Sequence, residues 1–123
     1  MLAAHKIIGF VPTKDSAQAR SFYEGKLGFQ FVSEDQFALV LRAGETMIRI
    51  AKANFTPAPF TILGWEVSNI EAEVAELQKR GVAFEKYPWV DDKVTGIWTA
   101  PGGDKVAWFK DPDGNVLSVS QHR

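Results

Sequence analysis

Hydrophobic and polar positions along the chain form short runs that predict strands and amphipathic helices, and their order is the same in both halves. The first half predicts a strand, a helix and three further strands: residues 6–11, 15–25, 29–34, 37–43 and 46–52. Asp15 and Gln18 have the form of a capping box that opens the helix. In this interpretation Pro12-Thr13-Lys14 ends the first strand, and Gly44-Glu45 forms a tight hairpin between the last two strands.

After a proline-containing linker at residues 54–59, the second half repeats this order. It predicts a strand, a helix and three strands: residues 60–67, 68–81, 82–87, 105–110 and 115–120. Ser68 and Glu71 form a second capping box, and the helix presents Ile70, Val74 and Leu77 on one face. Residues 88–104 are an insertion without a counterpart in the first half.

The repeat defines the expected architecture. We predict an α+β fold built from two β-α-β-β-β modules, residues 4–53 and residues 59–123, the second with the insertion at 88–104. The chain has 123 residues, which suits a single domain made of both modules.

Composition excludes several classes of function. The chain has no cysteine, so disulfides, thiol nucleophiles and cysteine-ligated metals are ruled out. Its 14 basic and 15 acidic residues give a net charge of −1, which predicts neither a nucleic-acid partner nor a membrane partner. The first residues lack a signal-peptide pattern, so we expect a cytoplasmic location. The two histidines, His5 and His122, lie near opposite ends, and we expect no serine–histidine–aspartate triad.

Three motifs together resemble the vicinal oxygen chelate superfamily: Phe22-Tyr23, Leu27-Gly28-Phe29, and the segment from Phe109 to Asn115 that contains Asp-Pro-Asp-Gly. This family includes glyoxalase I, extradiol dioxygenases and bleomycin-binding resistance proteins. The resemblance implies a curved mixed sheet whose two modules form an inner cup, with the helices outside. It also implies a small ligand or a metal inside the cup, and a homodimer.

The metal-dependent members of that family have ligands on the first and last strands of each module. In this sequence those four positions fall on Ile8, Arg49, Ile62 and Ser118. Because none of these side chains is suited to bind a divalent metal directly, we predict no metal and no cofactor. His5 is close to the first position, but three residues separate it from Ile8, so the two point to opposite faces of a strand.

Strand alternation indicates which side chains line the cup. The predicted ligand-binding residues are Ile8, Phe10, Met47, Arg49, Ile62, Glu66, Ser118 and, on the inserted loop with Trp89, Trp98. Arg49 either holds an anionic ligand or forms an ion pair with Glu66. Glu66 is in turn a weak candidate for a catalytic general base, with the structural ion pair as the alternative.

Three functions are compatible with these residues. The first is a metal-free small-molecule binding protein resembling the bleomycin-resistance branch, which holds a planar or anionic ligand in an apolar cup. The alternative is a glyoxalase-like lyase or isomerase, or a dioxygenase. Such an enzyme either has metal ligands at positions other than the four above, or uses Glu66 and Arg49 for acid–base chemistry. The third is a structural or regulatory dimer without a ligand, which an apolar cup with a few polar groups disfavours.

Overall fold

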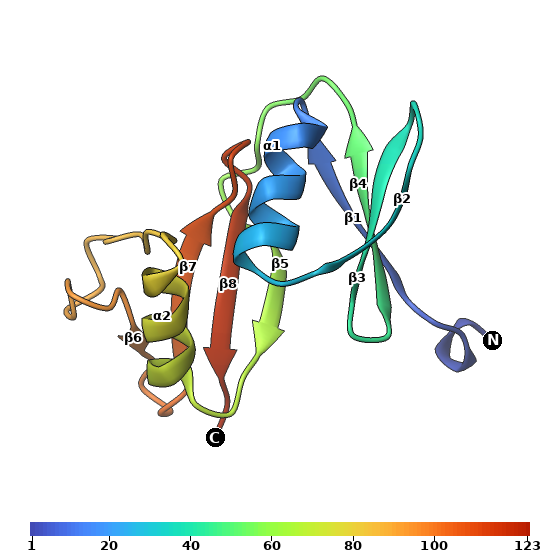
Figure 1. The fold of residues 1–123 in the computed structure, drawn as a ribbon. Helices are drawn as coiled ribbons and strands as arrows, with labels where there is room; N and C mark the ends of the chain where they lie inside the picture. The colour runs from blue at the N-terminus through green and yellow to red at the C-terminus, as the bar shows by residue number, and fades with distance from the viewer. The chain divides into compact units, whose positions relative to one another are not determined.

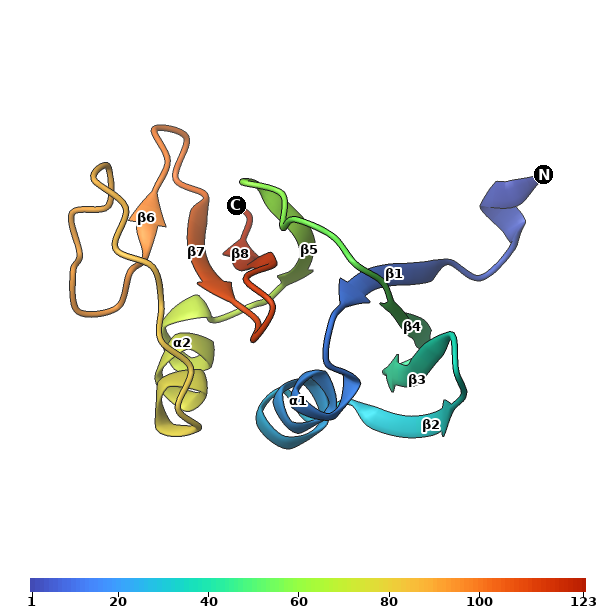
Figure 2. The same ribbon diagram turned by 90° about the horizontal axis from the view of Figure 1, so that it is seen from above.

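A computed structural model describes residues 1–123, which divide into two compact units, Met1–Thr56 and Pro57–Arg123 (Figure 1). Each unit contains a four-stranded mixed sheet and a helix that packs on one face of that sheet (Figure 2). The predicted α+β class, built from two such modules, is therefore confirmed. No helix is long and apolar enough to cross a membrane.

The first unit contains one sheet with the strand order β1-β4-β3-β2. Strand β1 runs parallel to β4, and the other pairs are antiparallel. The elements of this unit are η1 (Leu2–Ala4), β1 (Ile8–Thr13), α1 (Ser16–Arg20), the π-helical turn η2 (Ser21–Lys26), β2 (Gln30–Glu34), β3 (Ala38–Ala43) and β4 (Thr46–Lys52).

The prediction that Pro12 breaks the first strand is wrong. Strand β1 continues through Pro12 to Thr13, and Pro12 pairs with Ala51 of β4. Proline has no N–H group to donate, so it is tolerated only where that group needs no partner strand. Because β1 is the edge strand of its sheet, this condition is met.

The first helix begins where the sequence predicts. The Asp15 side chain accepts a hydrogen bond of 3.1 Å from the Gln18 N–H group and so caps the helix. Tyr23 is fully buried, and its ring packs against the rings of Phe22 and Phe29 at centroid distances of 5.2 and 5.6 Å. After η2 the chain reverses at Gly28, whose φ of 80° favours glycine. These contacts fix the helix against its sheet.

The second unit contains a sheet with the order β5-β8-β7-β6. Strand β5 is parallel to β8, and the other pairs are antiparallel. Its elements are β5 (Thr61–Glu66), α2 (Ile70–Lys79), β6 (Trp98–Thr99), β7 (Lys105–Lys110) and β8 (Val116–Gln121). The β7–β8 turn ends at Gly114, with a φ of 89°. The two units thus share the order strand, helix and antiparallel strands.

The cap of α2 lies one residue later than the Ser68–Glu71 capping box predicts. Asn69 is the N-cap residue, and its side chain accepts a hydrogen bond of 3.1 Å from the Ala72 N–H group. The Gln121 side chain accepts a second hydrogen bond, of 2.9 Å, from the Ile70 N–H group. Since two of the first N–H groups of the helix are satisfied in this way, Ser68 is not needed as a cap.

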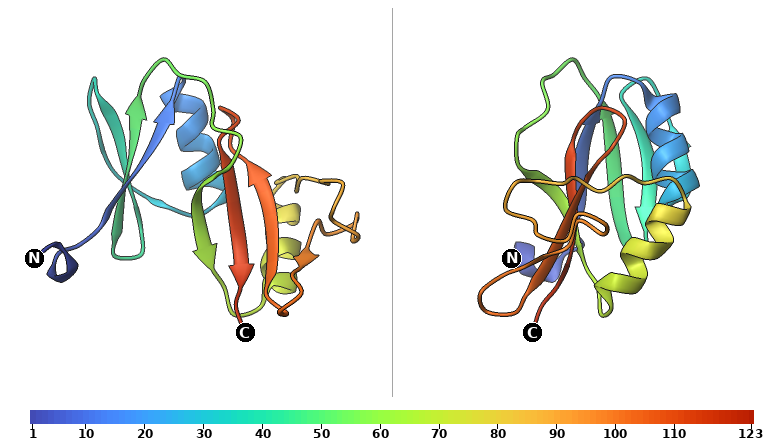
Figure 3. Two further views of the ribbon diagram at one scale, coloured as in Figure 1. Left: turned by 180° about the vertical axis from the view of Figure 1, so that it is seen from behind. Right: turned by 90° about the vertical axis from the view of Figure 1, so that its left-hand side faces the viewer.

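The predicted strand at residues 82–87 is also absent. Only Phe84 forms a bridge with Phe109 of β7, next to a hydrogen bond of 2.8 Å from the Glu85 N–H group to the Trp108 carbonyl. The start of the β7 edge, Lys105 and Val106, pairs with β6, which lies inside the predicted insertion. One edge therefore pairs with two short segments of the long connection between α2 and β7 (Figure 3).

The first testable prediction concerns the α2 cap. Replacing Asn69 with alanine removes the acceptor for the Ala72 N–H group and should destabilise the protein by about 1 kcal/mol. Ser68→Ala is the matched control and should change the free energy of unfolding by less than about 0.5 kcal/mol. Urea denaturation followed by circular dichroism measures both values. A larger loss for Ser68→Ala than for Asn69→Ala would contradict the observed cap.

A second prediction concerns acid stability. The N–H groups of Phe37 and Ala38 donate to the Asp35 carboxylate at 2.8 and 2.9 Å and hold its pKa below the ordinary value of 3.8. The ionised carboxylate therefore stabilises the fold above about pH 4, and this contribution is lost as the pH falls through the lowered pKa.

Asp35→Asn should consequently reduce the drop in melting temperature between neutral pH and acid. Asp91→Asn is the control, because Asp91 is exposed and makes no hydrogen bond or ion pair in its unit. Thermal unfolding over a pH series measures the drop. An unchanged acid dependence in Asp35→Asn would remove Asp35 from the groups that set acid stability.

Candidate functional site

The first unit has one sheet face that the helix leaves uncovered. Ile8 pairs with Met47, and Phe10 pairs with Arg49, so these four predicted site residues share one face. Their neighbours Val11, Ile48 and Ile50 point to the opposite, buried face. Ile8, Phe10 and Met47 are 45%, 64% and 36% exposed. We call this surface, made of Ile8, Phe10, Met47 and Arg49, the open face of the first unit.

Arg49 is the charged residue among these four, and Arg42, which pairs with Met47, lies on the same face of the sheet. Arg49 is half-buried and forms no hydrogen bond or ion pair within the first unit. The positive charge of Arg49 helps to lower the pKa of Asp35, but it contributes less than the hydrogen bonds that the Phe37 and Ala38 N–H groups donate. All the donor groups of this guanidinium are thus available to a ligand.

The second unit has an open face of its own. Ser118 lies between Gly64 of β5 and Trp108 of β7, and Glu66 pairs with Ser120. The register of β5 shifts between Thr61 and Leu63, so Ile62 has no partner in β8, although alternation puts it on the face of Gly64 and Glu66. Glu66 is exposed and forms no hydrogen bond or ion pair within this unit. Whether it pairs with Arg49 stays a prediction.

Four aromatic rings gather in the second unit, and we call them the aromatic cluster: Tyr87, Trp89, Trp98 and Trp108. Tyr87 and Trp89 stack with centroids 4.7 Å apart. Trp108 meets Tyr87, Trp89 and Trp98 at centroid distances of 5.6, 6.1 and 6.1 Å. Edge-to-face and stacked ring pairs stabilise one another at such distances. Trp108 is therefore the centre of the cluster.

Trp108 was not among the residues predicted from the sequence, although the hairpin that contains it was predicted. A hairpin around residues 111–114 places Trp108 opposite Ser118, which was already a candidate. Trp98 lies in strand β6, paired with Val106, and is half-buried. Trp89 lies in the preceding loop and is 54% exposed. Of the two tryptophans in the predicted insertion, Trp89 is thus the one with a largely accessible ring.

The four family metal positions carry no suitable donor set. Within the first unit they are Ile8 and Arg49, and within the second Ile62 and Ser118. An alkyl side chain offers no lone pair, and a guanidinium is a cation. No group of three or more histidine, aspartate, glutamate or cysteine side chains lies close enough to hold a metal ion. His5 is exposed and precedes β1. The residues at these positions therefore do not fit a metal.

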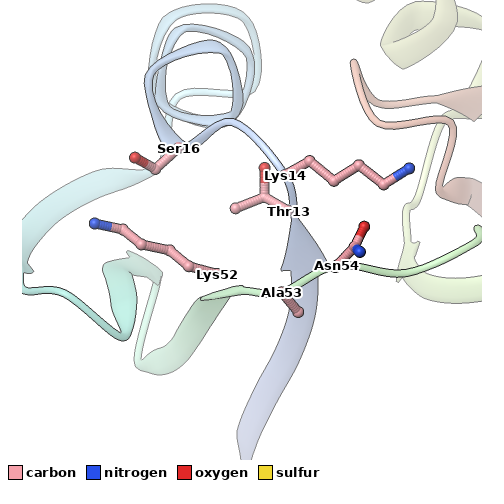
Figure 4. Close-up of a pocket in the computed structure, with 6 residues that line it drawn as sticks. All are labelled: Thr13, Lys14, Ser16, Lys52, Ala53 and Asn54. Carbon is pink, nitrogen blue, oxygen red and sulfur yellow. The ribbon is translucent and has the colours of Figure 1, made fainter.

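A polar hollow of about 510 Å³ lies in the first unit, away from its open face (Figure 4). It is lined by Thr13, Lys14, Ser16, Lys52, Ala53 and Asn54. The Lys52 ammonium lies 3.0 Å from the Glu34 carboxylate, which also accepts a hydrogen bond of 2.8 Å from Ser16. Because these polar groups are satisfied by one another, the hollow offers a ligand little.

The sequence predicts no serine–histidine–aspartate triad, yet the structure brings three such side chains into contact. His122 lies between Ser120 and Asp104: its Nε2 atom is 2.9 Å from Ser120 Oγ, and its Nδ1 atom is 3.2 Å from Asp104 Oδ2. The loop before β7 brings Asp104 next to a residue 18 positions later. Sequence position alone could not show this contact.

The paired β-α-β-β-β units, each with a four-stranded mixed sheet, define the class of fold. The sequence profile of the Glyoxalase/Bleomycin resistance protein/Dioxygenase superfamily matches residues 5–119, and the chain belongs to this family. The resemblance found from the motifs is confirmed. No curated protein matches the sequence.

Solved structures agree with this assignment. A superfamily member from Sphaerobacter thermophilus DSM 20745 is 22% identical, with a TM-score of 0.76, and the match covers 99% of this chain and 100% of that one. A glyoxalase family protein from Bacillus anthracis is 20% identical (TM-score 0.72; 97% and 95% covered). TnmS3, an antibiotic-binding protein from Streptomyces sp. CB03234, is 26% identical (TM-score 0.70; 100% and 99% covered).

A third prediction tests the centre of the aromatic cluster. Trp108→Ala removes three ring contacts and should cost about 2–4 kcal/mol of stability. Trp89→Ala removes an exposed ring and should cost about 1 kcal/mol. Urea denaturation with near-ultraviolet circular dichroism measures both losses. Equal costs would mean that the rings are independent and that Trp108 holds no central place.

Proposed function

We propose that this protein is a metal-free binding protein for small planar or anionic molecules, resembling the bleomycin-resistance branch of its family. The observation that carries the proposal is Arg49, a half-buried guanidinium without a partner in its unit, among the exposed apolar side chains of Ile8, Phe10 and Met47. A planar, permanently charged group with five donors suits a carboxylate or a sulfonate.

The apolar members of the same face support the proposal. Exposed apolar side chains that lie next to one another mark an interaction surface more often than isolated ones do. Here Ile8, Phe10 and Met47 surround the cation in adjacent strands. A ligand with an apolar body and one anionic group would match both properties of the face.

The aromatic cluster favours a planar ligand body. Trp89, which is 54% exposed, presents a ring that is already stacked on Tyr87 and so costs little entropy to order. TnmS3, which has the same fold, is an antibiotic-binding protein, and this supports small-molecule binding by the present chain as well. We propose that the predicted residues Ile62, Glu66, Trp98 and Ser118 are the ligand-binding residues of the second unit.

Two further features belong to this proposal. The side chains of Ile8, Arg49, Ile62 and Ser118 are poor metal ligands, which favours a site without a metal. The exposed apolar side chains of the open face also suit a homodimer, which light scattering after size-exclusion chromatography would test. The alternative, a metal-dependent lyase, isomerase or dioxygenase, requires ligands elsewhere in the chain.

Our fourth prediction concerns Arg49. Naphthalene-2-sulfonate and the uncharged 2-naphthol have the same planar body, so they separate the charge from the ring. Arg49→Ala should weaken sulfonate binding by about 1.5–3 kcal/mol, the value of a hydrogen bond to a charged group, and leave naphthol binding nearly unchanged. Isothermal titration calorimetry measures both affinities.

Arg80→Ala is the matched control, because Arg80 is an exposed arginine at the end of α2 whose guanidinium donates to Glu76 at 3.1 Å. Equal sulfonate affinity in wild type and Arg49→Ala would eliminate Arg49 as the anchor. Elemental analysis of untagged protein, expressed with zinc, nickel, manganese and iron supplied, tests the metal-free state. One tightly bound equivalent per chain would favour the enzyme alternative.

A further inference from the structure

The second unit contains a hydrogen-bonded chain of three side chains, Ser120, His122 and Asp104. Ser120 belongs to β8 and pairs with Glu66 and Val106 on the open face. His122 follows β8, and Asp104 precedes β7. The distances of 2.9 Å from Ser120 Oγ to His122 Nε2 and 3.2 Å from His122 Nδ1 to Asp104 Oδ2 connect them in one line.

The aspartate end of this chain is ionised at neutral pH. The Arg123 N–H group donates to Asp104 Oδ1 at 2.9 Å, and this bond, followed by the one from His122, holds the pKa of Asp104 below its ordinary value of 3.8. The Arg123 guanidinium in turn donates to the Gly102 carbonyl at 3.0 Å. Asp104 is therefore a fixed acceptor, held between the Arg123 N–H group and the His122 ring.

A fixed acceptor determines the tautomer of the neutral imidazole. Because an ionised carboxylate can only accept, His122 Nδ1 must carry the proton that it shares with Asp104. The Nε2 atom is then unprotonated and accepts a hydrogen bond from the Ser120 hydroxyl group. This arrangement of serine, histidine and aspartate is the one that activates a hydroxyl nucleophile.

A hollow large enough for a small substrate lies next to His122. This hollow, of about 550 Å³, is lined by Glu66, Val67, Ser68, Gln121 and His122. The His122 and Asp104 side chains are 49% and 44% exposed, so the hollow is open to solvent. Glu66, the Cα partner of Ser120, adds a negative charge that disfavours anionic substrates. Neutral, small and intrinsically reactive esters fit these conditions.

We propose that Ser120 is a catalytic nucleophile for small neutral activated esters, with His122 as its general base and Asp104 as a positioning residue. Ser120 Oγ forms a bond to the acyl carbon while its proton moves to His122 Nε2. The bond to the leaving alcohol breaks, and that oxygen receives the proton from His122. Water then attacks the acyl-serine by the same route and restores the free enzyme, so no further reactant is needed. The chemical step uses Ser120, His122 and Asp104 and does not involve Arg49.

Diisopropyl fluorophosphate tests the nucleophile in the unaltered protein. It should form one adduct, seen by intact mass and located at Ser120 by peptide mapping. Ser120→Ala should give no adduct, and His122→Ala should slow labelling about 100-fold, as expected for loss of a general base. Ser33→Ala is the control: Ser33 is an exposed strand serine without a histidine partner, and this variant should label at the wild-type rate.

Absence of an adduct at Ser120 in the wild-type protein would overturn the proposal, and this result needs no variant. An equal labelling rate in His122→Ala would do the same. Hydrolysis of p-nitrophenyl acetate provides a second readout, which Ser120→Ala should abolish. Turnover that persists in this variant would place the esterase activity at another residue and would also contradict the proposal.

The role of Asp104 is tested by conservative replacement. An asparagine amide can donate as well as accept, so Asp104→Asn no longer fixes the proton on His122 Nδ1, and labelling at Ser120 should slow about 10-fold or more. Asp104→Glu keeps an accepting carboxylate and should restore part of the rate. Equal labelling rates in the wild type and Asp104→Asn would show that Asp104 only anchors the end of the chain.

Discussion

Burial of one face of each sheet by a single helix is the constraint on which the rest of the structure depends. In the first unit, α1 and η2 place Ala19, Phe22 and Tyr23 in the core, together with Val11 and Ile50 from the sheet. In the second, Ile70 and Val74 of α2 are fully buried. Because strand side chains alternate, committing one set to the core leaves the other set outside. Function is therefore confined to the residues that the helices do not cover.

This constraint explains why the open faces were the most predictable part of the candidate site. Once Val11 and Ile48 are assigned to the core, alternation assigns Phe10 and Arg49 to the other face, and the parallel register then pairs them. The same reasoning applied to β7 would have found Trp108. Trp108 lies opposite Ser118, a predicted site residue, so the alternation of β8 carried across the hairpin places Trp108 on the same face.

Features that depend on competition between nearby groups were less predictable. Ser68 and Asn69 are both good cap residues, and the choice of Asn69 follows from where Gln121 meets the first turn. The internal repeat held a clue, because Asn69 follows Ile62 by the seven positions that separate Asp15 from Ile8. Residues 82–87 have strand composition, but β6 occupies part of the edge that they would need. Propensity does not indicate which segment takes a shared edge.

Contacts between residues far apart in the chain could not be predicted at all. His122 is separated from Asp104 by strands β7 and β8, and only their antiparallel register returns the chain to the same end of the sheet. The pairing of Lys105 with Gln121 makes this contact a consequence of the hairpin, since the residues just outside that pair must approach each other. The register that places Ser118 opposite Trp108 therefore also brings His122 to Asp104. One hairpin thus determines two separate features of the second unit, the aromatic cluster and the chain from Ser120 to Asp104.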